Sequence, residues 1–302
     1  MSFPRQVIPG RTYLVTRRCT QRQLLLRPDK ETNNAFVYCL AYAAKKAEVD
    51  IVAFIANANH YHAVVIDRTG TIPKFLELFH KLLAKHQNAL RRRWENMWST
   101  EQTSLVELVG PEDVLAKIVY TLTNPVKDHL VEKAHHWPGA TSLMATLHCS
   151  KLVARRPLRF FRRDGEMPEE LSISMATAPG FEHFEAADYA NTLREAICNA
   201  EAAAAQERRA ASRGIMGRKN VLAQSPEERP QSQRPRRELD PRVAARDKLP
   251  RIEALQRLKA FRAAYAAARR SWLGGNGALF PCGTWWLRRC AAVPCADEVA
   301  AL

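Results

Sequence analysis

Two histidines, His60 and His62, lie two residues apart in the segment Asn59-His-Tyr-His62. If this segment is a β-strand, its two-residue period directs both imidazoles to one face and Tyr61 to the other. Two imidazoles on one rigid face form half of a binding site for a divalent metal ion. The same pattern is also typical of two hydrogen-bonded core histidines, so the pair alone leaves both interpretations open.

A second candidate stretch is Tyr120-Thr-Leu-Thr-Asn-Pro-Val126. On a helix, Tyr120 and Asn124 are four residues apart, so their side chains share one face. Pro125 disfavours helical geometry at Asn124 and removes a backbone donor, which predicts a kink or break there. Such a break can expose Tyr120, although a tyrosine on an amphipathic helix is more often a core or rim residue.

The elements that must position these residues alternate between strands and helices. Strands are expected at 12–16, in two apolar runs within 51–66 joined by a turn at 57–59, and at 104–109. Helices are expected from Thr32, as N-cap, to about 48, then from Pro73 to the arginines at 91–93, and from about 112. An α+β fold with a ferredoxin-like antiparallel four-stranded sheet satisfies this order with short connections. We expect its helices on one face and the other face open to a ligand.

The periodicity changes beyond Gly139. The segment Arg155–Arg163 alternates cations with aromatic residues, a composition typical of single-strand binding, although an amphipathic strand with snorkelling arginines explains it equally well. Helices are expected at 185–213 and 250–272, separated by a proline-rich, linker-like segment at 225–242. We therefore predict a catalytic domain and a mainly helical extension. Their ranges are 1–145 for the catalytic domain, 146–215 for a basic strand and helix segment, 216–248 for the linker and 249–302 for a basic helical segment.

Composition narrows the class of protein. The 302 residues carry a net charge of +15, which favours a polyanionic partner. The seven cysteines are odd in number and form no Cys-x-x-Cys pair, so we expect free thiols in a reducing compartment. No apolar signal core or run of membrane-spanning length is found. We expect a soluble, cytoplasmic protein with no membrane partner.

Together, the two candidate stretches resemble the HUH (His-hydrophobic-His) superfamily, and most closely its REP-associated tyrosine transposases, which are single-tyrosine, insertion-sequence-like enzymes. The resemblance covers about residues 1–145. It is carried by Arg11–Cys19, Asn59–His62, Glu95-Asn96-x-Trp98, Tyr120-x-x-x-Asn-Pro-Val126 and Trp137-Pro-Gly139. This sequence departs from many members at Asn57 and Ala63, where they have a methionine and a bulky aliphatic residue.

The resemblance implies a metal-dependent DNA transposase. His60, His62 and Asn124 would hold Mg²⁺ or Mn²⁺, and Tyr120 would attack the DNA backbone to give a 5′-phosphotyrosine and a free 3′-OH. The expected partner is single-stranded or hairpin DNA in a bacterial nucleoid, and whether the protein is a monomer or a homodimer stays open. The cations expected to contact DNA are Arg17, Arg18, Arg155, Arg156, Arg159, Arg162 and Arg163.

Two other functions fit parts of this pattern. A relaxase or replication-initiator nuclease would use the same chemistry, but relaxases usually place the tyrosine ahead of the histidines. A non-catalytic or domesticated nucleic-acid-binding protein of the same fold is the other alternative. Loss of His60, His62 or Tyr120 would be expected in an inactive remnant, and all three are present.

Overall fold

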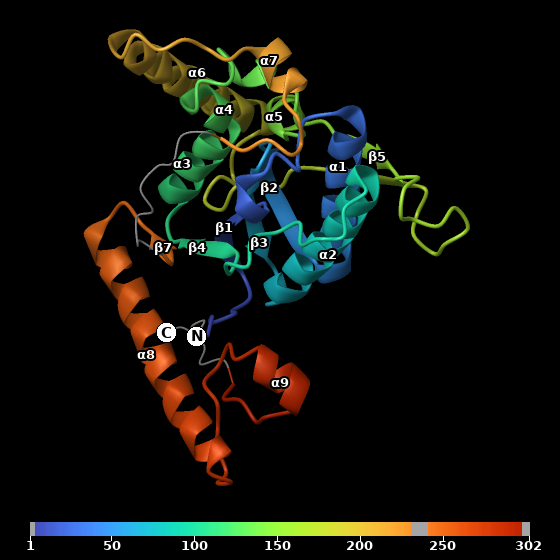
Figure 1. The fold of residues 1–302 in the computed structure, drawn as a ribbon. Helices are drawn as coiled ribbons and strands as arrows, with labels where there is room; N and C mark the ends of the chain where they lie inside the picture. The colour runs from blue at the N-terminus through green and yellow to red at the C-terminus, as the bar shows by residue number, and fades with distance from the viewer. Residues whose placement is uncertain (1–3, 231–240, 298–302) are drawn as a thin grey trace.

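The computed structural model describes residues 4–230 and 241–297, and its centre is one mixed β-sheet (Figure 1). The strand order is β2-β3-β1-β4-β7, in which β7 pairs parallel to β4 and every other neighbouring pair is antiparallel. The strands are β1 (Arg11–Arg18), β2 (Val49–Ala56), β3 (His60–Asp67), β4 (Ser104–Leu108) and β7 (Val243–Ala244). The α+β class agrees with the prediction. The predicted four-stranded antiparallel sheet is corrected to a five-stranded mixed one, because β7 adds a strand too short to leave a sequence pattern.

Helices cover both faces of the sheet, so the prediction of helices on one face and an open second face is wrong. Helices α1 (Lys30–Ala47) and α2 (Ile72–Arg91) cover the first face, and α3 (Pro111–Leu122) packs on the second. The reason lies in β3, where Val64 and Val65 point to opposite faces and both are fully buried. A strand that is apolar on both sides requires a cover on each.

Helix α1 begins at Lys30, and its N-cap is Asp29 instead of the predicted Thr32. The Asp29 carboxylate accepts a hydrogen bond from the Thr32 backbone N–H at 2.8 Å. This satisfies one of the helix's otherwise unpaired first-turn donors. Arg91, in the last turn of α2, forms an ion pair with the same carboxylate at 2.6 Å and so joins the two helices.

The chain after residue 145 packs on the helices that cover the two faces of the sheet. The hairpin of β5 (Leu152–Arg155) and β6 (Glu170–Ile173) lies on α1, and α6 (Ala186–Ala210) lies on α3. Ala154 and Leu171 belong to the hydrophobic core on the sheet face that α1 and α2 cover. Leu193 and Ile197 belong to the core on the face that α3 covers. The remaining elements are η1 (Thr20–Arg22), α4 (Asn124–Lys127), η2 (Ala134–His136), α5 (Leu143–Leu147), α7 (Arg218–Ala223), α8 (Lys248–Leu273) and α9 (Trp286–Ala291).

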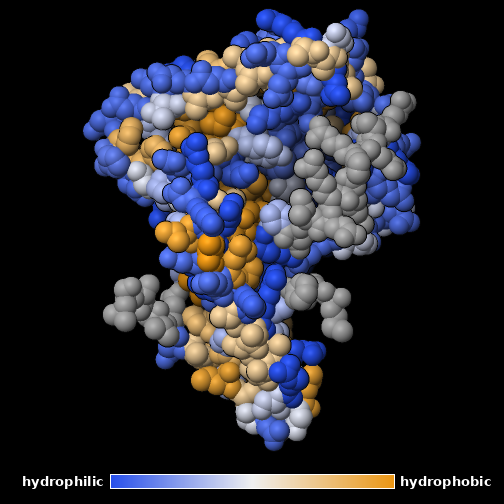
Figure 2. All heavy atoms as spheres, turned by 90° about the vertical axis from the view of Figure 1, so that its left-hand side faces the viewer, coloured by the Kyte–Doolittle hydropathy of each residue, from blue (hydrophilic) through white to orange (hydrophobic). Residues whose placement is uncertain are grey.

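Helices α6 and α8 correspond to the predicted helices at 185–213 and 250–272. The predicted apolar face of α8 is only partly buried, with Phe261 inside and Ile252 and Leu255 exposed. Figure 2 views the molecule from the side on which α8 lies in Figure 1, and it shows hydrophobic residues on that surface. Residues 231–240 of the predicted linker lie outside the described residues. Within the described ranges, no helix has the length and apolar character needed to cross a membrane.

Candidate active site

The paired histidines share one face of β3, as their spacing predicts. The ring centroids of His60 and His62 are 4.9 Å apart. Tyr61 points to the opposite face, where it packs edge-on against Phe36 and its hydroxyl hydrogen-bonds to His80 Nε2 at 2.6 Å. The strand therefore separates a histidine pair from a core tyrosine.

Tyr120 reaches the histidines from the end of α3. The predicted break occurs at Thr123, whose backbone (φ −99°, ψ 5°) separates α3 from the short α4 that begins at Asn124. The Tyr120 ring lies 5.2 Å from that of His62, centroid to centroid, at an interplanar angle of 71°. The buried Asn124 amide oxygen accepts a hydrogen bond from Asn57 Nδ2 at 2.8 Å. The structure thus brings together all four predicted site residues.

In both histidines, Nδ1 forms a hydrogen bond with a neighbouring side chain, and Nε2 faces the site. Asn59 Oδ1 lies 2.6 Å from His60 Nδ1, and because an amide oxygen only accepts, the proton is on that nitrogen. Thr16 Oγ1 lies 2.7 Å from His62 Nδ1. His60 Nε2 accepts from Asn57 Nδ2 at 3.1 Å, whereas His62 Nε2 is buried and meets no hydrogen-bond partner in the described part of the chain. Metal-binding histidines are oriented by such bonds to the second nitrogen.

Both imidazoles are neutral at pH 7. The pKa of His60 is lowered to about 3. The main cause is burial of the ring, and the positive charges of Arg18 and Arg22 add to the effect. The pKa of His62 lies well below its usual value, first because the ring is buried, and then because of the charge that His60 would carry if protonated and the charges of Arg18 and Lys117. The Nε2 lone pairs are therefore available to a metal ion across the physiological pH range.

The donor set fits a divalent ion. No cluster of three or more His, Cys, Asp or Glu side chains that could hold a metal is found among residues 4–230 and 241–297. A site here must therefore combine the two imidazoles with amide oxygen. The Asn57 NH₂ group lies between the lone pairs of His60 Nε2 and Asn124 Oδ1, a position that would also suit a cation. Its own Oδ1 is buried and meets no partner among the residues described.

Two lysines lie beside Tyr120, and sequence reasoning did not identify them. Lys117 Nζ is 5.5 Å and Lys127 Nζ is 5.3 Å from the centroid of the tyrosine ring. Lys117 precedes Tyr120 by three residues on α3, a spacing that could have indicated the contact. Lys127 reaches the ring only because the chain turns at Thr123. Both cations can stabilise negative charge that develops at Tyr120 or on a phosphate.

Of the two predicted DNA-contacting arginines on β1, Arg18 lies beside the site. It is exposed and pairs with His60 in the β1–β3 register. Arg17 points to the other face, where its Nη1 donates to His80 Nδ1 at 2.8 Å and its guanidinium lies 5.5 Å from the centroid of the Trp98 ring. Its contacts are therefore with the packed core.

The segment Arg155–Arg163 does not join the histidine site. In Figure 1, the β5–β6 hairpin lies beyond α1, on the side away from α3 and α4. Three of its arginines have partners within the protein: Arg155 with Glu170 at 3.8 Å, Arg156 with the carbonyls of Gly165 and Met167, and Arg159 with Glu31 at 2.7 Å. Arg162 and Arg163 are exposed. A DNA contact by this hairpin stays a prediction.

The fold and the site define an α+β protein in which a paired-histidine face meets a tyrosine from a helix end. The sequence matches no protein family model, and it matches no curated protein. A solved structure of a REP-associated tyrosine transposase bound to a REP hairpin is 16% identical, with a TM-score of 0.42 over 49% of this chain and 86% of that one. A candidate transposase from Deinococcus radiodurans R1 is 15% identical, with a TM-score of 0.28 over 35% of this chain and 85% of that one. Both solved structures are described as transposases, the class of protein that the sequence pattern resembles, and the similarity is of low identity and covers half of this chain or less.

Proposed function

We propose that this protein is a DNA strand-transferase of the transposase type, which cleaves and rejoins single-stranded or hairpin DNA through Tyr120. The observation that carries the proposal is the contact between Tyr120 and His62, whose ring centroids are 5.2 Å apart. It places a potential nucleophile beside an imidazole whose Nε2 meets no partner among the described residues. Tyrosine forms covalent intermediates in this way when a nearby group activates it.

His60, His62 and Asn124 would hold Mg²⁺ or Mn²⁺. When bound, the ion would polarise a phosphoryl oxygen and offset the charge of the transition state. The residues of the chain supply the rest of the site. Asn59 and Thr16 orient the two imidazoles. Tyr120, in the last turn of α3, places its ring beside His62.

The covalent step exchanges one phosphate ester for another. The Tyr120 hydroxyl gives up its proton to water and its oxygen attacks the phosphorus. The bond between phosphorus and the 3′ oxygen breaks, and that oxygen takes up a proton from water to leave a 3′-OH. Lys117 and Lys127 favour the phenolate that attacks. The new phosphotyrosine retains the ester, so a 3′-OH can reverse the step and join strands without ATP. Because only one tyrosine takes part, each active site holds one covalent intermediate at a time.

The test is covalent capture of DNA. Full-length protein with MnCl₂ and a labelled single-stranded hairpin should give a protein–DNA adduct that survives a denaturing gel. Tyr120→Phe should give none while still binding the hairpin, since only the hydroxyl is lost. Tyr42→Phe, at a partly exposed position on α1, is the matched control and should form the adduct normally. An adduct formed by Tyr120→Phe would contradict the assignment, and binding without any adduct would favour the non-catalytic alternative.

A further inference from the structure

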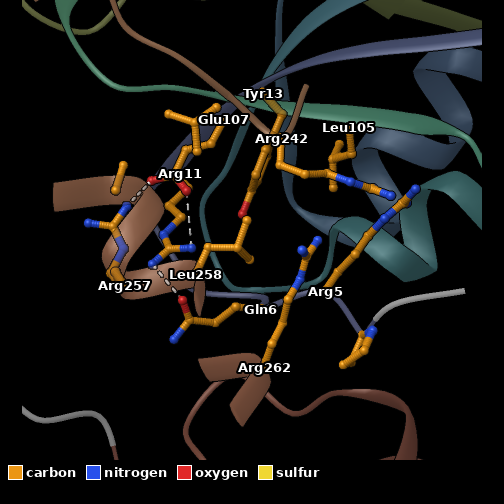
Figure 3. Close-up of a pocket in the computed structure, with 13 residues that line it drawn as sticks. Arg5, Gln6, Arg11, Tyr13, Leu105, Glu107, Arg242, Arg257, Leu258 and Arg262 are labelled. Atoms are coloured by element: carbon orange, nitrogen blue, oxygen red, sulfur yellow. Dashed lines mark hydrogen bonds and ion pairs between the residues drawn. The ribbon is translucent and has the colours of Figure 1, made fainter. Parts of the chain in front are cut away.

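A second site lies at the other end of β1 from the histidines and on its other face. Arg11 and Tyr13 of β1 line it together with Glu107 of β4, the N-terminal segment, β7 and α8 (Figure 3). Its arginines are Arg5, Arg11, Arg242, Arg257 and Arg262. Thr16, which contacts His62, follows Tyr13 by three residues on β1. Because side chains alternate along a strand, Tyr13 and Thr16 point to opposite faces. This pocket is therefore separate from the proposed active site.

The pocket is strongly positive. Five arginines and one glutamate line it, so four positive charges are in excess. Glu107 is shared by two of the arginines, with Arg11 at 3.3 Å and Arg257 at 2.5 Å. Figure 3 shows the side chains of Arg5 and Arg242 extending towards each other, and that of Arg262 pointing into the same space. Bringing several guanidinium groups together in a half-buried space costs free energy unless an anion offsets their repulsion.

A buried hydroxyl points into the pocket. Tyr13 is only 3% exposed, and its Oη forms no hydrogen bond of normal geometry within the described residues. Burial raises the pKa of Tyr13 well above its usual value, against the lowering effect of Arg11. The hydroxyl is therefore protonated and can donate. A buried donor without an acceptor costs roughly 1–3 kcal/mol, and an anionic oxygen in the pocket would remove that cost.

We propose that this pocket binds a single phosphate group. The pocket is partly open to solvent and has a volume of about 40 Å³, which is room for roughly three water molecules. A space of this size suits a group as small as a phosphate, with the rest of any larger ligand outside the pocket. Guanidinium groups suit several phosphate oxygens at once, because each presents parallel N–H donors. The phosphate comes either from a DNA backbone or from free phosphate. In both cases it would join α8 and the N-terminal segment to strands β1 and β4 of the sheet, since the lining residues come from segments far apart in the sequence.

Thermal unfolding of the full-length protein tests the pocket directly. Sodium phosphate should raise the melting temperature above that in sodium chloride of equal ionic strength. Arg262→Gln and Tyr13→Phe should lose most of this rise, whereas Arg269→Gln, at an exposed position further along α8, should keep it. A phosphate effect of equal size in all four proteins, or none in the wild type, would overturn the proposal.

Binding of a labelled single-stranded oligonucleotide then distinguishes the two sources of phosphate. If the pocket holds a DNA phosphate, inorganic phosphate should weaken DNA binding beyond the effect of chloride. Arg262→Gln should then lower the slope of log K against log salt by about one. If the pocket holds free phosphate, Arg262→Gln should leave that slope unchanged. Neither readout requires strand cleavage, so both remain valid if the chemistry proposed for Tyr120 fails.

Discussion

Asn57 donates its side-chain amide to Asn124 Oδ1 at 2.8 Å, and the same nitrogen lies 3.1 Å from His60 Nε2. One NH₂ group therefore satisfies two lone pairs that the proposed metal ion would need. A metal ion must displace this amide or turn it, and turning it would present Asn57 Oδ1, which is buried and meets no partner in the described ranges. The residue at this position thus sets how readily the site accepts an ion.

Asn57→Asp should bind Mn²⁺ about ten-fold more tightly than the wild type, since a carboxylate both loses the competing donor and attracts the cation. Without metal, the same variant should be less stable by roughly 1–3 kcal/mol, because its oxygens face Asn124 Oδ1 and His60 Nε2 with no proton between them. Calorimetric titration with MnCl₂ and thermal melting measure the two effects. Ala58→Asp adds the same charge in the same turn. If it tightens Mn²⁺ binding equally, general attraction and not the position of Asn57 explains the gain.

Lys127→Met should slow covalent adduct formation by about 10–100-fold while changing hairpin affinity much less. The reason is that Lys127 Nζ lies 5.3 Å from the Tyr120 ring centroid and would stabilise charge that develops during attack. Single-turnover cleavage rates at saturating DNA measure the effect. Lys133→Met is the matched control, because Lys133 pairs with Glu201 at 3.1 Å instead of contacting Tyr120. Equal rates for the two variants would remove Lys127 from the mechanism.

Local spacing was sufficient to predict the centre of the site. The period of a strand places His60 and His62 on one face, and Pro125 forces the helix to break beside Asn124. Neither inference required knowledge of the rest of the fold. The role of Asn57 could not be predicted in this way. Its amide contacts Asn124 only because α3 and α4 pack over the β2–β3 turn, and that packing is a long-range property.

The same limit explains the errors. Val64 and Val65 indicate a strand buried on both faces, but the sequence does not say which helix provides the second cover. The cations of Arg155–Arg163 have a composition typical of nucleic-acid binding. Composition alone could not show that Glu31, from a helix more than a hundred residues earlier, pairs with Arg159. Strand β7 has only two residues, too few for any period to appear.

Mn²⁺ binding should change little between pH 7.5 and pH 5.5. Two histidines with the usual pKa near 6.5 would both be protonated at the lower pH, and affinity would fall about 100-fold. Here the pKa of His60 is lowered to about 3 and that of His62 is also well below its usual value. Both stay neutral, so we expect a change of less than about three-fold. A 100-fold loss would show that the imidazoles are more accessible to water than their packing indicates.

Folding stability, unlike Mn²⁺ affinity, should depend on pH. The unfolded chain takes up protons on these histidines near pH 6.5, whereas the folded protein resists until about pH 3 at His60. Stability is therefore lost progressively as the pH falls from about 6.5 towards 3. Circular dichroism at pH 5.5 must confirm that the protein is folded before its metal affinity is compared.

Tyr61→Phe tests whether the two faces of β3 act independently. Arg17 Nη1 donates to His80 Nδ1 at 2.8 Å, so the proton of this histidine lies on Nε2, which donates to Tyr61 Oη at 2.6 Å. Removing the hydroxyl leaves a buried donor without an acceptor. We expect a loss of roughly 1–3 kcal/mol in the free energy of unfolding, measured by urea denaturation. Tyr42→Phe, which removes a partly exposed hydroxyl, should change stability by less than about 0.5 kcal/mol.

Below its melting temperature, the Tyr61→Phe protein should still bind Mn²⁺ and form the DNA adduct at the wild-type level. The ring remains, so its contact with Phe36 holds the strand in place, and the imidazoles of His60 and His62 lie on the other side of the backbone. The hydroxyl thus contributes to folding, whereas the neighbouring histidines contribute to the site. If a fully folded Tyr61→Phe protein lost Mn²⁺ binding, the geometry of the histidine pair would depend on the Tyr61–His80 hydrogen bond. Tyr61 would then be a positioning residue of the active site.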